Sequence, residues 1–238
     1  MALQNFDKLN SLATKWFEKM DVPAEEKRKR AELAIDYCEI MILLFLLITE
    51  QEFERADCIS FAEERLRVLA ERELGSENIA YINDWAKIKA VEIVDMTYEK
   101  YENEIEDVIE EEVETKEVPE EPVTEERRIR VPELDIDVPE PEYWTSEERA
   151  LLIGIELATT VYNFNELYEA MQAGKTRKVW MTEADDRVRP THDAVHGVDL
   201  PINELFLVGD SYMLMPLDTA NGAETKEVAG CRCHLVCY

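Results

Sequence analysis

Apolar residues recur at helical spacing through most of the first hundred positions. In the range 3–20 they fall three or four residues apart, which predicts an amphipathic helix that Asp21-Val22-Pro23 ends. A longer helical stretch follows, with a bend or break expected near residues 50–56. Gly75 is its expected end, because glycine readily adopts the left-handed conformation that closes a helix. The range 82–98 repeats the spacing and predicts a third amphipathic helix.

The most apolar run, Ile40–Ile48, is too short for a transmembrane helix. Glu39 and Glu50 flank it closely, whereas a membrane-spanning helix needs about 20 apolar residues. We therefore expect a helix buried in a core or against a partner, and no membrane association. The first residues lack the apolar segment and cleavage site of a signal peptide, and the five cysteines are an odd number. Both features favour reduced thiols in a cytosol.

The pattern changes in residues 113–144. This range is acidic and contains five prolines, which favour a stiff, extended path: Pro119, Pro122, Pro132, Pro139 and Pro141. Residues 127–138 alternate enough that part of them could pair as a strand. The range is predicted to be a semi-rigid linker.

After the linker, Thr145 and Glu148 form a capping-box pattern that predicts a helix start, and Gly174 is the expected end. Short strands are then predicted at 178–181, 205–208 and 212–215, with a helical turn at 191–195. The predicted fold is α+β. It comprises a mostly helical N-terminal domain (1–112), an acidic proline-rich linker (113–144) and a small compact α+β module (145–238).

The net charge of the chain limits the kinds of molecule that it is expected to bind. With 26 lysines and arginines against 54 aspartates and glutamates, the net charge is −28. Such a chain repels phosphate backbones, so specific nucleic-acid binding is not expected. The acidic residues either dock on a basic protein surface or are simply solvated.

All three histidines and three of the cysteines lie in the last third of the chain. His192 and His196 are four residues apart and would share one face of a helical turn, and Cys231 and Cys233 add two sulfur donors. These four residues form a candidate tetrahedral zinc site. His234 and Cys237 are additional donors, and the C-x-C spacing is unusual for zinc. The alternative is a hydrogen-bonded histidine beside buried thiols.

Two further interpretations concern the neighbours of these residues. Asp186 could orient His192, or the Asp185–Arg189 segment could use its ion pairs to hold its own shape, which we favour. Cys231 beside Arg232 could be a nucleophile of lowered pKa, but the chain has no glycine-rich phosphate loop, G-x-S-x-G or H-E-x-x-H motif. The protein is therefore predicted not to be an enzyme.

The order of residues in positions 145–238 resembles the phage Mu F-like minor head proteins, also called the phage head morphogenesis family. The resemblance rests on Glu156, Asn163, Gly174, Lys178-Val179-Trp180, Asp186-Arg187-Val188-Arg189, His192, Gly197, Phe206, Met215-Pro216 and Cys231-Arg232-Cys233. The sequence departs from the family at two positions. Gly230 stands where the family often has asparagine, and His196 where it often has aspartate, so the resemblance does not extend a ligand role to His196.

The resemblance implies a minor capsid protein of a tailed bacteriophage, made in the host bacterial cytoplasm and incorporated into the virion at the portal vertex or capsid interior. Its implied partners are the portal protein, the major capsid protein or both, on which it could form an oligomer in a symmetric assembly. Its implied role is in head assembly, DNA packaging or DNA exit. Two alternatives remain: a zinc- or thiol-dependent enzyme built on His192, Cys231 and Cys233, and a transient scaffold-type assembly chaperone.

Overall fold

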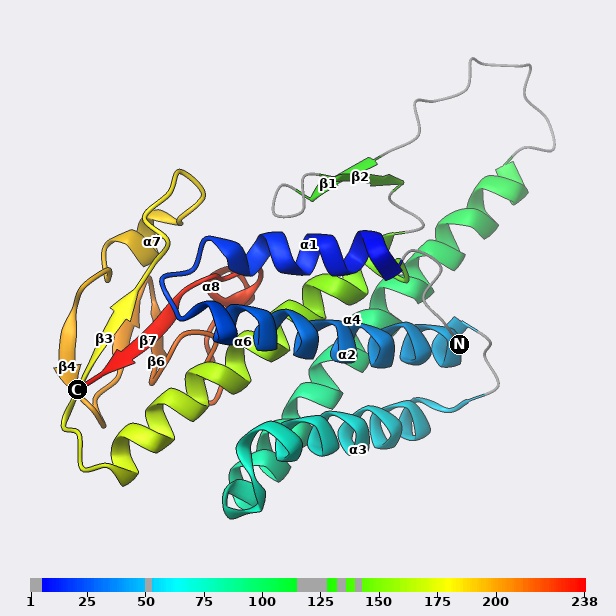
Figure 1. Cartoon of the computed structure of the whole chain (residues 1–238). Coiled ribbons are helices and arrows are strands. Elements are labelled where there is room, and N and C mark those ends of the chain that lie inside the picture. The colour runs from blue at the N-terminus through cyan, green and yellow to red at the C-terminus, as the bar shows by residue number, and fades with distance from the viewer. Residues whose placement is uncertain (1–5, 50–52, 115–127, 132–135, 140–142) are drawn as a thin grey trace. The chain divides into compact units, whose positions relative to one another are not determined.

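The computed structural model describes residues 6–49, 53–114, 128–131, 136–139 and 143–238, of which residues 101–114, 128–131 and 136–139 are described by their backbone alone. Figure 1 follows the chain from blue to red. The helices are α1 (Phe6–Glu18), α2 (Ala24–Thr49), α3 (Arg55–Leu74), the 3-10 turn η1 (Ser76–Asn78), α4 (Ile79–Glu114), α6 (Glu147–Gln172), α7 (Pro190–Asp193) and α8 (Thr225–Val228). The strands are β1 (Arg128–Val131), β2 (Ile136–Pro139), β3 (Arg177–Met181), β4 (Asp199–Pro201), β5 (Phe206–Val208), β6 (Ser211–Met213) and β7 (His234–Cys237).

The N-terminal helices begin and end where the apolar pattern changes. The interruption predicted near residues 50–56 falls between α2, which ends at Thr49, and α3, which begins at Arg55. Gly75 follows α3 with a φ of +76°, a conformation that costs glycine little because it has no Cβ. The predicted helix end at Gly75 is therefore confirmed.

The start of α6 differs by one residue from the prediction. Ser146, not Thr145, caps the helix, because the Ser146 Oγ accepts a hydrogen bond from the Arg149 N–H at 3.1 Å. The far end agrees with the prediction, since Gly174 has a φ of +74° and its N–H donates to the Met171 carbonyl oxygen.

The apolar run Ile40–Ile48 lies inside α2. Met41 and Leu44 are fully buried, whereas Leu43 is 42% exposed. The expectation of a largely buried helix is confirmed. Among the helices of the described ranges, none is long and apolar enough to cross a membrane.

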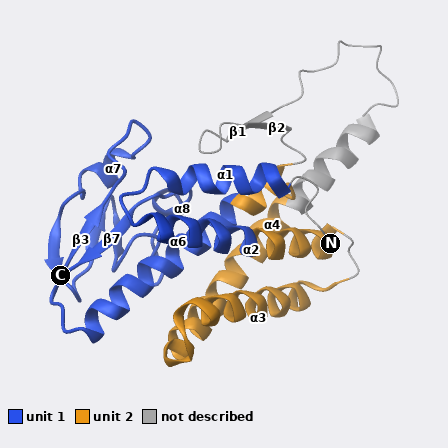
Figure 2. Cartoon of the chain, viewed as in Figure 1, with its two compact units in different colours: residues 1–37, 152–238 blue, residues 38–151 orange. Residues whose placement is uncertain are grey.

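Residues 38–151 form one of two compact units, drawn in orange in Figure 2. Within it, α3 and α4 pack along each other through small and medium-sized apolar side chains. Ala62, Leu66 and Ala70 on α3 and Ala86 and Ala90 on α4 are fully buried. Small side chains allow the two helix axes to approach closely.

The second unit contains residues 1–37 and 152–238, drawn in blue in Figure 2. Its three-stranded antiparallel sheet has the order β4-β3-β7, and a separate β5-β6 hairpin turns at Gly209. Trp180 of β3 is fully buried and meets the Phe206 ring edge to face at 5.4 Å between centroids. The central strand β3 therefore anchors the core of this unit.

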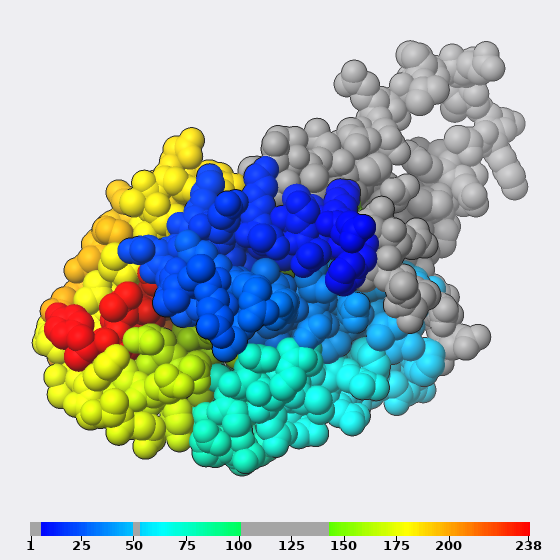
Figure 3. All heavy atoms as spheres, viewed as in Figure 1, coloured from blue at the N-terminus to red at the C-terminus, as the bar shows by residue number. Residues whose placement is uncertain are grey.

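Helix α1 and the first part of α2 belong to the same unit as the C-terminal sheet. In the space-filling view, their blue atoms adjoin the yellow and red atoms of the C-terminal region (Figure 3). The buried guanidinium of Arg30 on α2 lies 4.8 Å from the centroid of the Tyr162 ring on α6 and also pairs with Glu26. The compact units thus group the chain differently from the domains predicted at 1–112 and 145–238.

The predicted α+β class is confirmed, with mostly helical N-terminal sequence and a small C-terminal sheet accompanied by helices. Of the predicted linker 113–144, most lies outside the described residues. The part predicted to pair as a strand contains β1 and β2, which form an antiparallel pair with Ile129 opposite Val138. The prediction missed β4, β7 and α8.

Candidate metal centre

Two short segments, both after β3 in the sequence, supply the candidate donors. His192 lies on α7, a single helical turn with Pro190 at its first position, where the missing N–H costs nothing. Cys231 and Cys233 lie in the loop that leads into β7. That strand pairs antiparallel with β3, with Leu235 opposite Trp180. The edge of the Trp180 ring also contacts His192 at 5.7 Å between centroids, so β3 holds both segments.

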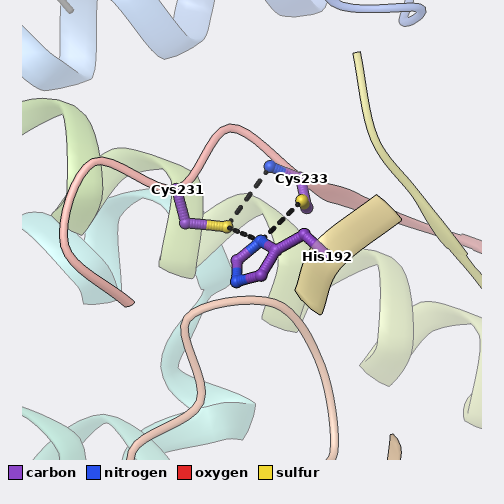
Figure 4. A group of neighbouring side chains, drawn as sticks. All are labelled: His192, Cys231 and Cys233. Carbon is purple, nitrogen blue, oxygen red and sulfur yellow. Dashed lines mark hydrogen bonds between the residues drawn. The ribbon is translucent and has the colours of Figure 1, made fainter. Parts of the chain in front are cut away.

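His192, Cys231 and Cys233 form a buried cluster (Figure 4). The His192 Nδ1 lies 3.3 Å from the Cys233 Sγ and 3.6 Å from the Cys231 Sγ, and no side chain of the three is more than 3% exposed. Around a tetrahedral zinc ion, a nitrogen at about 2.0 Å and a sulfur at about 2.3 Å are about 3.5 Å apart. The three residues therefore have donor atoms, spacing and burial that suit a metal ion.

The two thiols differ in acidity. Hydrogen bonding with Cys233, and secondarily with His192, lowers the pKa of Cys231 well below its ordinary value of 9.0. The same hydrogen bond, together with burial, raises the pKa of Cys233. One thiol therefore ionises readily, and the second needs additional positive charge nearby, which a bound cation supplies.

Glu227 of α8 lies against the other ring nitrogen of His192. Its Oε2 is 3.3 Å from the His192 Nε2 and accepts a hydrogen bond from the Thr191 hydroxyl at 2.7 Å. Both carboxylate and imidazole are buried. The His192 Nε2 makes no hydrogen bond with any of the described residues in this geometry, but a carboxylate this close favours a proton on Nε2, and the Nδ1 lone pair would then be available to a metal. The neighbour of His192 is thus Glu227 and not Asp186.

His196 does not join the cluster. The predicted four-residue spacing places it beside His192 only if the helix continues, but α7 ends at Asp193 and the following residues form tighter turns. The His196 Nδ1 instead lies 3.1 Å from the Thr182 backbone nitrogen, whose N–H it accepts, and 2.9 Å from the Thr182 hydroxyl. Three of the four predicted ligands are brought together.

His234 and Cys237, the additional donors, point elsewhere. The His234 Nδ1 lies 3.8 Å from the Glu183 Oε1, with both side chains buried. Burial raises the pKa of Glu183 to about 7 and lowers that of His234 to about 4. Burial also raises the pKa of Cys237 to about 11, and its backbone N–H donates to the Glu166 carboxylate.

Asp185 and Arg232 form a bidentate pair that connects the two segments. The Arg232 Nη1 and Nη2 donate to the carboxylate oxygens of Asp185 at 2.8 and 2.6 Å, and the Arg187 N–H donates to the same carboxylate. The hydrogen bond from Arg232 lowers the pKa of Asp185 to about 2. The interpretation of this segment's ion pairs as structural fits this geometry, with Arg232 bound to Asp185 and not placed as an activator of Cys231.

A small cavity of about 20 Å³ adjoins the cluster. His192, Cys231 and Cys233 line it together with Glu183 and Arg232. Glu183 and Glu227 were not singled out from the sequence, because two glutamates carry no distinguishing signal in a chain with 54 acidic residues.

Comparison of the chain with protein-family models, with curated proteins and with solved structures finds no match.

Proposed function

We propose that the chain is a minor head protein of a tailed bacteriophage and that a zinc ion, bound by His192, Cys231 and Cys233, fastens its C-terminal loop. One observation carries the proposal. Several of the residues on which the resemblance rests, including Glu156, Asn163 and Arg189, meet around a single loop, 229–233, although they are far apart in the sequence.

Three of these residues bind the backbone of that loop. The Glu156 carboxylate accepts a hydrogen bond from the Gly230 N–H, and the Arg189 guanidinium donates to the Ala229 carbonyl oxygen. The Asn163 amide donates to the Cys233 carbonyl oxygen at 3.2 Å, and its oxygen accepts from the Leu235 N–H. Motif residues that are far apart in sequence but bind the same loop are expected if the motif reflects a shared structural unit. A chance sequence match would not be expected to give this arrangement.

Zinc is the ion that this donor set favours. Two thiolates and an imidazole are soft and borderline donors, which suit zinc better than magnesium or calcium. The ion would join α7 to a loop about 40 residues further along the chain, in a region with only short strands. Metal binding to folded but not unfolded chain stabilises the fold by mass action.

The zinc centre predicts a matched pair of cysteine variants. Elemental analysis of the purified full chain should give one zinc per protein, and Cys231→Ser should lose it. Cys237→Ser is the control, because Cys237 is also buried but lies outside the cluster, and it should keep its zinc. Chelation should lower the thermal midpoint of the wild type and of Cys237→Ser alike. Full zinc content in Cys231→Ser would contradict the ligand assignment.

The role in the head is tested by counting the chain in purified particles. Mass spectrometry of heads assembled with and without portal protein should find the chain in mature particles, at a level that falls when the portal is left out. Equal amounts in both would reject portal docking and leave the major capsid protein as the partner. Absence from mature particles would favour the transient scaffold and reject a virion component.

A further inference from the structure

Only three of the described residues offer donors to the same point, whereas zinc usually takes four ligands. His196 is bound to Thr182, as described above. Cys237 is four residues beyond Cys233 along β7, which at 3.3 Å per residue places it about 13 Å further on. Glu227 contacts the His192 Nε2, and the two ring nitrogens of an imidazole point away from each other. None of these residues lies where it could provide the fourth donor to an ion held by Nδ1 and the two sulfurs.

The cavity beside the cluster is placed for that fourth ligand. All three metal-binding side chains line it, and its volume of about 20 Å³ suits one water-sized group. The cavity thus adjoins all three donor residues and has room for one further small ligand.

Glu183 supplies an independent indication that a polar group belongs in this space. It lines the same cavity and its side chain is buried. Among the described residues its Oε1 has no hydrogen-bond partner, and it lies 3.8 Å from the His234 Nδ1, which has none either. Buried carboxylate oxygens almost always have a partner, so an orphaned one indicates a water molecule or ion that completes it. The carboxylate is not part of the donor group, in which all atoms lie within 4.8 Å of one another.

We infer that the zinc centre is three-coordinate in protein ligands and keeps its fourth position open to this cavity, where it binds water or a small monodentate anion next to Glu183. This inference rests on the zinc centre proposed above. Zinc sites with three protein ligands and one exchangeable position bind and activate small molecules, whereas structural sites are closed by a fourth side chain. The centre therefore has a ligand-binding capacity beyond the fastening of the loop.

The charge of the site fits a small neutral or anionic ligand. Two thiolates cancel the two positive charges of zinc, so the centre itself is neutral. Arg232 lines the cavity, but its guanidinium is neutralised by Asp185, and Glu183 adds a carboxyl group. An anion should bind here weakly when Glu183 is ionised, and more tightly when its carboxylate is replaced by an amide.

Cobalt(II) substitution tests the open position, because its visible absorption bands report the ligands around the metal. The full chain is loaded with cobalt and titrated with azide. We expect thiolate-to-cobalt bands on loading and a saturable change of the visible bands with azide. In Glu183→Gln the same change should occur with a lower Kd for azide. His196→Gln should behave as the wild type, because His196 lies outside the cluster.

The other possible outcomes distinguish failure of the open fourth position from failure of the zinc centre itself. If cobalt binds with thiolate bands but azide changes nothing in the wild type or in Glu183→Gln, the fourth position is closed and the inference fails while the metal centre stands. If azide acts only on Glu183→Gln, then Glu183 is the fourth ligand and the inference is likewise overturned. If no thiolate bands form, the proposed metal centre fails.

Discussion

Glu227 lies 3.3 Å from the His192 Nε2, and its carboxylate favours a proton there, which would leave Nδ1 free to bind metal. Glu227→Gln keeps the size of the side chain but removes the charge. We expect zinc affinity to fall roughly 10- to 100-fold. The measurement is competition with a chromophoric chelator at constant pH. Glu224→Gln is the control, since Glu224 is half exposed and pairs with Lys226. Equal losses in both variants would show that Glu227 has no special role.

Burial of the Lys178 side chain on β3 makes the stability of the protein depend on pH. The side chain is fully buried, its Nζ donates to the Leu214 carbonyl oxygen at 2.7 Å, and burial lowers its pKa from 10.5 to about 8. Between pH 8 and 10.5 the unfolded chain therefore binds more protons at this lysine than the folded chain. Its contribution to stability rises with pH across that window and is constant below it.

Lys178→Met removes this dependence. The free energy of unfolding of the wild type minus that of the variant should increase by roughly 1 to 3 kcal/mol between pH 8 and 10.5. Urea unfolding of both proteins at a series of pH values measures it, and groups common to both proteins cancel in the difference. A flat difference curve would mean that Lys178 keeps an ordinary pKa in the folded protein.

At the scale of the elements, the side-chain amide of Asn163 connects helix α6 to strand β7. Asn163 of α6 is fully buried, donates to the carbonyl oxygens of Cys233 and Pro216, and accepts from the Leu235 N–H at 3.2 Å. Asn163→Ala leaves these backbone groups without partners, and each buried unsatisfied group costs about 1–3 kcal/mol. We expect a loss of roughly 2 kcal/mol or more in urea unfolding. The control is Asn221→Ala, at an exposed turn, which should change stability by less than about 0.5 kcal/mol.

The helices were predictable because a run of 13 to 36 residues repeats its apolar spacing several times. The short elements were harder. The strand β4 has an aspartate and a proline around a single leucine, which is not a strand pattern, and β7 contains His234 and Cys237, residue types that suggest metal donors. His192, Cys231 and Cys233 were predicted from residue type. His196 was not placed correctly, because its spacing argument needed a helix longer than the four residues of α7.

At the scale of the molecule, residues 1–37 and 152–238 form one compact unit although more than a hundred residues separate them in sequence. No local sequence pattern predicts that residues 1–37 pack with residues 152–238. The sequence of α1 predicts only that the helix has an apolar face that must be buried. That face includes Leu9, Trp16 and Phe17, each at most 6% exposed. The amphipathic pattern predicts the helix but not the surface against which it packs.

The grouping predicts that a fragment of residues 145–238 is incomplete. Without α1 and the first part of α2, it loses the cover that these helices give and the packing of Arg30 on Tyr162. The isolated fragment should unfold at a lower temperature and with less cooperativity than the full chain. A peptide of residues 1–37 added in trans should raise its thermal midpoint, and the same peptide with Phe17→Asp should not, because Phe17 is fully buried. Calorimetric titration of both peptides gives the binding directly. If the fragment unfolds as cooperatively as the full chain and does not bind the peptide, residues 145–238 form an independent domain and the prediction is wrong.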